Sequence, residues 1–274
     1  FLFCLDFNYN YSSQFYYNSI IIKLMIEIKE ISKSFDGNKI LNNISTSFVK
    51  GKTNLIIGQS GSGKTVLLKC LLGLHSSDNG EILYDGVSNK NMSESNKTLL
   101  RREMGMVFQG SALFDSMTVL ENVMFPLQML TQKKNDEIIQ RAENAIYRVE
   151  LKKAKQKLPS ELSGGMQKRV AIARAIVMNP KYLFCDEPNS GLDPRTAIVI
   201  DNLIQEITKE YDITTIINSH DMNSVLEIGE KIIFLENGMK KWEGTNKEIF
   251  STKNKSITDF VYSSELLKKV KKYL

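Results

Sequence analysis

Eight consecutive residues have the types and spacing of a phosphate-binding loop. Residues 58–65 read Gly-Gln-Ser-Gly-Ser-Gly-Lys-Thr and match the pattern G-x-x-x-x-G-K-[ST] at every fixed position. The glycines let successive backbone N–H groups face an anion, while Lys64 would reach the β- and γ-phosphates and the Thr65 hydroxyl would ligate Mg²⁺. An apolar run at 53–57 predicts a strand before the loop, and residues 64–74 predict a helix after it. The sequence therefore predicts nucleotide phosphate binding.

Two carboxylates and a histidine follow runs with strand character. Asp186 and Glu187 end the apolar run that starts at residue 182, and His220 follows the β-rich run 214–219. Functional groups gather at the carboxyl ends of parallel strands, where Asp186 could hold the Mg²⁺ hydration shell and Glu187 could polarise an attacking water. The residues alone leave two other interpretations open, namely an acid pair that caps the next helix and a structural histidine.

Three weaker candidates lie elsewhere in the chain. Phe35 precedes a turn at 36–38 and would either stack on an adenine ring or pack in the core. Gln109 ends a short apolar strand predicted over 106–109. Residues 163–165, Ser-Gly-Gly, open a helix predicted to run to about 178, with Ser163 as N-cap and glycines that permit close approach to a positively polarised helix end. Alone, this triplet is also typical of a flexible turn.

Composition and charge describe an ordinary globular chain. It has 274 residues, of which 42% are hydrophobic and 24% are charged, enough for one α/β domain or two small ones. The net charge is +5, and residues 251–274 carry most of it with six lysines against two acidic residues. The nearly neutral remainder argues against a nucleic-acid-binding face. The lysine-rich segment is either a solvated helix end or a contact with an anionic surface.

The order of patterns predicts three segments. Residues 1–24 have no domain pattern and open on Phe1, so we expect them to be upstream sequence outside the working protein. Residues 25–250 form the main domain, which begins with strands and turns, continues through a polar link at 89–97 and helices at 118–130 and 136–149, and ends with a hairpin around Asn237-Gly238. Residues 251–274 would form a basic helical extension.

In this order the motifs resemble those of the ATPase subunits of ABC transporters, over residues 25–250. The Walker A motif falls on 58–65, the Q-loop glutamine on Gln109 and the signature on 162–166. Walker B falls on 182–187, the D-loop on 189–193 and the switch histidine on His220. The resemblance implies an α/β fold: a P-loop NTPase core of mostly parallel sheet flanked by helices, an antiparallel β subdomain and an inserted helical subdomain at about 110–178.

The resemblance also implies cofactors and a site, with ATP and Mg²⁺ as the bound groups. Its catalytic residues are Glu187, His220, Gln109 and Lys64. Its metal-holding residues are Thr65, Gln109 and Asp186. Its nucleotide-binding residues are Phe35, Gly58, Gln59, Ser60, Gly61, Ser62, Gly63, Lys64, Thr65, Val66, Ser163, Gly164, Gly165 and Asp193.

Within that superfamily the chain looks like the lipid-asymmetry (Mla/Mkl, mammalian-cell-entry-linked) transport ATPases. Residues 108–123, residues 163–169 and the triplet His220-Asp221-Met222 carry this resemblance. The expected function is ATP hydrolysis that drives phospholipid transport at the cell envelope. The alternatives are transport of another cargo (lipoprotein release, amino acid or ion uptake) and a soluble ABC ATPase outside transport, which usually has two cassettes or a long coiled-coil insertion.

The same resemblance implies partners and a location. The chain would form a homodimer, in which the Ser163-Gly164-Gly165 helix start of one copy completes the ATP site of the other. Integral membrane permease subunits would contact residues 110–125, and a lipid-binding subunit would supply cargo; no nucleic acid is expected. The chain would lie peripherally at the cytoplasmic face of the inner (plasma) membrane. An apolar stripe of Ile257, Phe260, Val261 and Leu267 would pack on the partner ATPase subunit.

Overall fold

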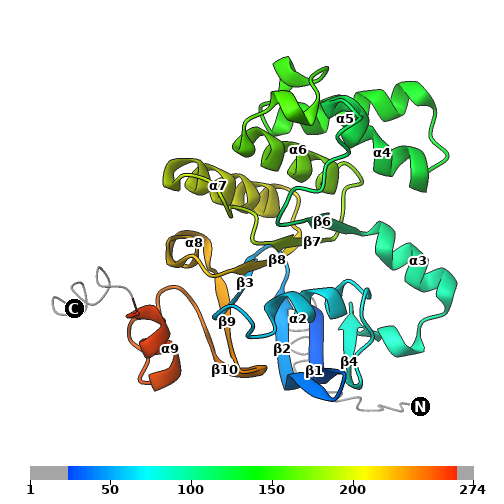
Figure 1. Cartoon of the computed structure of the whole chain (residues 1–274). Helices are drawn as coiled ribbons and strands as arrows, with labels where there is room; N and C mark the ends of the chain where they lie inside the picture. The colour runs from blue at the N-terminus through cyan, green and yellow to red at the C-terminus, as the bar shows by residue number, and fades with distance from the viewer. Residues whose placement is uncertain (1–23, 264–274) are drawn as a thin grey trace, which may run out of the picture.

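Two β-sheets and the helices around them make up the structure, a computed structural model that describes residues 24–263 (Figure 1). A six-stranded sheet has the order β10-β9-β3-β8-β7-β6, and a four-stranded antiparallel sheet has the order β2-β1-β4-β5. The first sheet consists of β3 (Thr53–Ile57), β6 (Met104–Val107), β7 (Tyr182–Asp186), β8 (Thr214–Ser219), β9 (Lys231–Glu236) and β10 (Met239–Gly244). The second consists of β1 (Leu24–Phe35), β2 (Asn38–Val49), β4 (Asn79–Tyr84) and β5 (Val87–Ser88).

The central sheet is parallel except at β10, which pairs antiparallel with β9. Its middle strands β3 and β8 are buried along their whole length, which explains their continuous apolar character. In the register, Ile57 of β3 lies beside Ser219 of β8, and Asp186 of β7 lies beside Asn218. The carboxyl ends of three adjacent strands therefore meet at one edge of the sheet.

Two tight hairpins follow from left-handed turn residues. Asp36 and Gly37 have φ values of 49° and 78° between β1 and β2, and Asn237 and Gly238 have 49° and 71° between β9 and β10. Two successive positive φ values are typical of the type I′ turn, whose twist matches that of the strands. The hairpin predicted at Asn237-Gly238 is confirmed.

The helices cover both faces of the central sheet, and α4, α5 and α6 gather at one end of the molecule (Figure 1). Several begin at side chains that cap free N–H groups: Thr118 before α4, Ser163 before α6 and Asp193 before α7. The α-helices are α2 (Lys64–Leu71), α3 (Glu94–Arg102), α4 (Val119–Leu130), α5 (Asn135–Arg148), α6 (Gly164–Ile176), α7 (Pro194–Glu210), α8 (Met222–Ile228) and α9 (Lys255–Val261). The 3₁₀ turns are η1 (Asn89–Asn91), η2 (Lys152–Ala154) and η3 (Pro159–Glu161).

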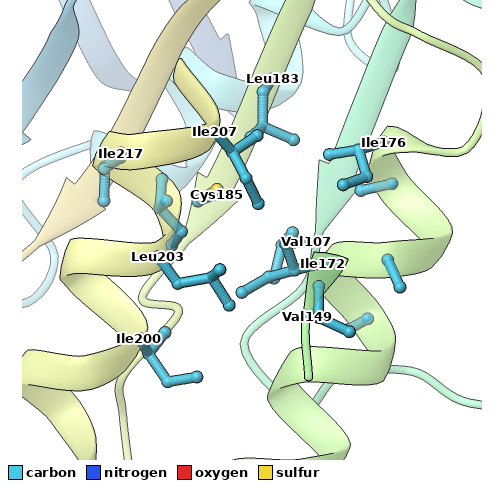
Figure 2. Packing of buried hydrophobic residues seen from close by; sticks show 14 of the residues in the cluster. Val107, Val149, Ile172, Ile176, Leu183, Cys185, Ile200, Leu203, Ile207 and Ile217 are labelled. Carbon is cyan, nitrogen blue, oxygen red and sulfur yellow. The ribbon is translucent and has the colours of Figure 1, made fainter. Parts of the chain in front are cut away.

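Alternation along the strands divides the core into two layers. Leu183, Cys185 and Ile217 point toward α6 and α7, where Ile172 and Ile207 meet them (Figure 2). The next residues along the same strands, such as Phe184 and Ile216, pack with α2 and with the antiparallel sheet. The predicted fold, an α/β P-loop core with an antiparallel sheet and inserted helices, is confirmed.

Two expectations change on the structure. The polar stretch at 89–97 is not merely a link, because η1 and the first half of α3 occupy it and Ser93 caps α3. Within the predicted apolar stripe, Ile257 and Val261 are buried in the chain's own core, and the Phe260 ring lies 5.0 Å from Phe234. That part of the stripe is already covered within one copy.

The segment predicted at 1–24 lies outside the described residues except for its last residue, and Leu267 lies outside them too. Within residues 24–263, none of the helices has the length and apolar character that a bilayer crossing requires.

Candidate active site

The loop after β3 has a backbone that glycine alone can adopt without strain. Gly58 and Gly63 have φ values of 152° and 101°. A Cβ on Gly58 would lie 2.2 Å from the carbonyl oxygen of Leu235, and one on Gly63 would lie 2.8 Å from Leu41 Cδ2. Strands β9 and β2 thus pack closely against Gly58 and Gly63 of the phosphate loop (residues 58–65). This packing holds it in a tight curve before α2 begins at Lys64.

Two side chains of the phosphate loop suit a bound triphosphate. Lys64 Nζ donates to the carbonyl oxygens of Gly58 and Gln59, at 2.8 and 3.0 Å. Burial lowers the pKa of Lys64, and the charges of Glu187 and Asp186 oppose that shift. The Ser62 hydroxyl is buried and has no hydrogen-bond partner within the described chain. Phosphate oxygens would accept from both groups, so the loop fits the ligand that its sequence predicts.

Oxygen ligands for a divalent cation stand beside the loop. Thr65 Oγ1 donates to Asp186 Oδ1 at 3.3 Å, which joins the first turn of α2 to the end of β7. Across residues 24–263 no group of three or more His, Cys, Asp or Glu side chains forms a metal cage. Mg²⁺ commonly uses one or two protein oxygens together with substrate phosphates and waters. The Thr65–Asp186 pair therefore fits Mg²⁺ bound together with a nucleotide.

Glu187 is held from two sides and from its own backbone. Gln109 Nε2 donates to Glu187 Oε2 at 3.0 Å, and His220 Nδ1 lies 3.0 Å from Glu187 Oε1. The Glu187 N–H donates to the carbonyl oxygen of Asn218 at 3.1 Å. The ends of β6, β7 and β8 thus converge on one carboxylate, as a general base requires. The amide nitrogen of Gln109 bonds to Glu187 rather than to Asp186, and a metal-holding role for the Gln109 side-chain oxygen stays a prediction.

The structure argues against both alternative interpretations of these residues. The acid pair does not cap the next helix, because α7 is capped by Asp193, whose carboxylate accepts from the backbone N–H groups of Arg195 and Thr196 at 3.1 Å each. His220 is not a structural core residue, since its side chain is 60% exposed and its described contact is to Glu187.

The Ser163-Gly164-Gly165 turn lies against the start of α7 in its own chain. Ser163 Oγ accepts from the Met166 N–H at 3.3 Å, as an N-cap does. A Cβ on Gly165 would lie 2.6 Å from Thr196 Cγ2, so this end of α6 lies against the start of α7. Within residues 24–263 no hydrogen bond joins the turn to the phosphate loop. Ser163 and Gly164 are exposed, which leaves this helix start open at the surface.

Phe35 is not a core residue. Its side chain is 38% exposed, and its ring meets the edge of the His75 ring at 5.3 Å between centroids. The same hairpin places the Ile40 carbonyl oxygen 3.1 Å from the Cβ position of Gly63. The ring is therefore accessible and lies on a hairpin that touches the phosphate loop, where it could stack on a base. Of the other predicted binding residues, Gln59, Ser60, Gly61 and Thr65 are exposed, and Val66 is half-buried against the core.

Sequence reasoning missed three residues that shape the site. Buried Lys168 on α6 donates from Nζ to the carbonyl oxygen of Gln109, and burial lowers the pKa of Lys168. Arg174 donates to the carbonyl oxygens of Ser111 and Ala112 at 2.8 Å each and so supports two residues with positive φ. Asn218 holds Asp186 from β8. The signal for Lys168 and Arg174 is a basic residue among the buried positions of α6. The signal for Asn218 is a single amide near the end of the otherwise apolar and hydroxyl-bearing strand β8.

Comparison with known proteins gives consistent relatives. Residues 41–190 match the family described as ABC transporter. The methionine import ATP-binding protein MetN of Clostridium tetani is 38% identical over 243 residues, which cover 89% of this chain and 76% of that relative. The methionine import ATP-binding protein MetN 1 of Staphylococcus aureus (strain N315) is 38% identical over 231 residues, which cover 83% of this chain and 67% of that relative.

Solved structures show the same fold. The dimeric structure of a post-hydrolysis state of the ATP-binding cassette MJ0796, bound to ADP and Pi, aligns with a TM-score of 0.73 at 31% identity and covers 81% of this chain and 99% of that chain. CbiO1 from Clostridium perfringens, part of the ABC transporter complex cbiONQ, aligns with a TM-score of 0.79 at 31% identity. The alignment covers 90% of this chain and 99% of that chain. The two relatives described above are named for methionine import, so they do not support the predicted membership in the lipid-asymmetry branch. The chain belongs to the ABC transporter family as an ATP-binding subunit, and it hydrolyses ATP to power transport.

Proposed function

We propose that this chain powers an importer for methionine or a closely related amino acid, as one of two ATPase subunits bound to a membrane permease. The hydrolytic part rests on one observation: Glu187 is held between Gln109 and His220 beside a complete phosphate loop. The cargo rests on 38% identity to a methionine import protein over 89% of the chain. This replaces phospholipid as the expected cargo and adopts the amino acid alternative.

Each residue of the site has a role in this proposal. The phosphate loop and Lys64 bind the β- and γ-phosphates, and Thr65 with Asp186 holds Mg²⁺. When bound, the cation polarises the phosphates and offsets their charge. Glu187 orients the attacking water and accepts its proton, while Gln109 and His220 keep the carboxylate turned toward the phosphates. Phe35 stacks on the adenine ring.

The site is completed by a second copy. The Ser163-Gly164-Gly165 turn supplies a hydroxyl, backbone N–H groups and the positive end of the α6 dipole, and it is exposed instead of facing its own loop. Asp193 is the last residue of the D-loop and fixes the start of α7, which packs beside this turn. The dimeric form of the related cassette MJ0796 supports this arrangement. We expect ATP to hold the two copies together and its cleavage to release them.

An apolar groove next to Gln109 suits the permease. It has a volume of about 270 Å³, and Phe108 and Phe114 on its rim are 42% and 40% exposed. Arg174 fixes the adjoining loop by its bonds to Ser111 and Ala112. A movement of Gln109 would reach a permease helix bound in this groove through the adjoining loop. The same contact would hold the chain peripherally at the cytoplasmic face of the membrane.

Reconstitution tests the cargo directly. The chain is purified with its co-expressed permease, placed in liposomes, and assayed for ATP hydrolysis and uptake of labelled methionine with the matching solute-binding protein. We expect stimulation by the methionine-loaded binding protein, and no uptake with Glu187→Gln, which serves as the matched control. Stimulation by a phospholipid-carrying subunit, with no response to methionine, would contradict the proposed cargo and leave the ATPase assignment intact.

A further inference from the structure

One buried side chain beside the metal pair has no explanation in packing. Asn218 is the fifth residue of β8, in the middle of the central sheet, and its side chain is fully buried. Along the same face its neighbours are Ile216 on its own strand and Ile56 across β3. A buried amide among aliphatic side chains destabilises a fold unless its polar atoms are paired. Asn218 therefore needs a polar function at this position.

Half of the amide has a clear partner. Asn218 Nδ2 donates to Asp186 Oδ1 at 2.8 Å, a closer contact than the 3.3 Å from Thr65 Oγ1 to the same oxygen. Because an ionised carboxylate only accepts hydrogen bonds, the NH₂ group and not the carbonyl must face Asp186. Both described bonds go to Oδ1, which leaves Asp186 Oδ2 available to another ligand.

The other half of the amide lacks a partner. Asn218 Oδ1 is buried and makes no hydrogen bond within residues 24–263. A buried carbonyl without a donor costs roughly 1–3 kcal/mol, so such atoms usually accept from an ordered water or a bound group. A water bound to a divalent cation is a strong donor, and the Thr65–Asp186 pair that would hold the cation lies against this amide.

We propose that Asn218 is a positioning residue of the Mg²⁺-ATP site. Its NH₂ group orients Asp186 for the cation, and its free carbonyl oxygen accepts a hydrogen bond from a water of the cation's shell. The inference rests on the proposed Mg²⁺-ATP site and adds to it a residue that works through Asp186. The backbone of Asn218 has a separate task, since its carbonyl oxygen accepts from the Glu187 N–H. Changing the Asn218 side chain should therefore weaken the binding of the metal without displacing Glu187, the proposed general base.

Metal affinity tests this inference apart from catalysis. In the Glu187→Gln background with ATP bound, Mn²⁺ is titrated and its free form is followed by electron paramagnetic resonance. Asn218→Leu, which keeps the volume and removes both polar atoms, should weaken Mn²⁺ binding roughly 10- to 100-fold, the usual cost of losing an outer-shell partner. ATP affinity measured in EDTA should stay within about twofold, because the phosphate loop is unchanged.

The matched control is Thr214→Val. Thr214 lies on the same strand and the same face, is fully buried, and also has a hydroxyl without a partner in the described chain, but it stands at the far end of β8. The Thr214→Val variant should therefore bind Mn²⁺ with the same affinity as its parent. If Asn218→Leu does not fold, Asn218→Thr provides the second variant: its one hydroxyl can replace one of the two contacts, so an intermediate loss is expected.

The outcomes distinguish the proposed role of Asn218 from the proposed Mg²⁺-ATP site on which it depends. Equal Mn²⁺ affinity in Asn218→Leu and its parent, or equal losses in Asn218→Leu and Thr214→Val, would overturn the role of Asn218 while leaving the ATPase site in place. Failure of the parent itself to bind Mn²⁺ with ATP would overturn the metal site, and the inference with it.

Discussion

At the scale of single residues, the two acids after β7 are prepared for different tasks. Glu187 has both carboxylate oxygens engaged, one by Gln109 and one by His220, so its orientation is determined from two strands. Asp186 has both of its described contacts on one oxygen, from Thr65 and Asn218. In the proposed function, Glu187 would accept the proton in this fixed orientation, and the second oxygen of Asp186 would be available to a cation.

Replacing Glu187 by Gln should separate binding from turnover. The amide keeps the volume and one acceptor oxygen but cannot take a proton. We therefore expect ATP affinity close to the wild-type value and a hydrolysis rate lower by roughly 10²- to 10⁴-fold. Single-turnover hydrolysis and nucleotide binding are measured on the same preparations, with Glu81→Gln on the remote β4 as the control. Hydrolysis at the wild-type rate would show that Glu187 is not the base.

At the scale of elements, a buried carboxyl joins three segments around the site. Asp201 of α7 is 3% exposed and accepts from Asn189 Nδ2, which also donates to Ser224 Oγ on α8 at 2.7 Å. Asn189 belongs to the D-loop, and α8 follows the loop that carries His220. Burial raises the pKa of Asp201 from 3.8 to about 6; hydrogen bonds from Ser224 and Asn189 lower it, and the charges of Asp221 and Glu227 raise it.

This pKa gives the stability of the fold a predictable pH dependence. In the unfolded chain Asp201 loses its proton near pH 4, whereas in the folded chain it keeps the proton until about pH 6. Between pH 4 and 6 the folded state binds more protons than the unfolded state. The contribution of Asp201 to the free energy of unfolding is therefore fully present below pH 4 and is lost as the pH rises through 6. The difference corresponds to roughly 3 kcal/mol at most.

Asp201→Asn should remove this dependence. The free energy of unfolding of the variant, relative to the wild type, should rise between pH 4 and 7 in denaturant titrations, because the variant has no charge to bury. Asp115→Asn, at an exposed position, serves as the control and should show no such change. A constant difference between Asp201→Asn and wild type across this range would contradict the prediction.

The elements show which patterns a sequence reveals. Continuous apolar runs predicted β3 and β8, and Ser163 predicted the start of α6, because burial and capping leave local signatures. The polar stretch at 89–97 concealed the start of α3, which has no buried residue and so no apolar periodicity. Hydrogen bonds such as Asn218 to Asp186 join residues 32 apart in the chain. No local pattern records a contact at that separation.

At the scale of the whole molecule, the predicted catalytic and metal-holding residues of one copy lie together. The signature turn of the same copy does not join them. The ends of β3, β6, β7 and β8 meet around Glu187 and the phosphate loop, whereas Ser163 and Gly164 face outward beside α7. The motifs predicted this division, since it belongs to the family they resemble. They did not determine the cargo, because the residues that resembled lipid-transport ATPases lie around the shared nucleotide site and not at a cargo site.

The signature turn offers a variant that disables it without disturbing the fold. Among the described residues, a Cβ on Gly164 would meet only Leu192 Cδ2, at 3.4 Å, which is an ordinary contact. Gly164→Asp adds a negative charge at the positive end of α6, which favours the isolated helix but repels a triphosphate. We expect a protein that is at least as stable as the wild type in thermal unfolding and inactive in hydrolysis. Gly164→Ala is its uncharged control.

The most direct test of the shared site pairs two inactive variants. Lys64→Ala and Gly164→Asp are co-expressed with different tags, and mixed assemblies are isolated through both tags. If each site takes its phosphate loop from one copy and its signature turn from the other, one site of every mixed pair is intact, and hydrolysis should recover to roughly half the wild-type rate. If each copy held a complete site, both members of the pair would be defective, and a mixed assembly with no activity would contradict the account.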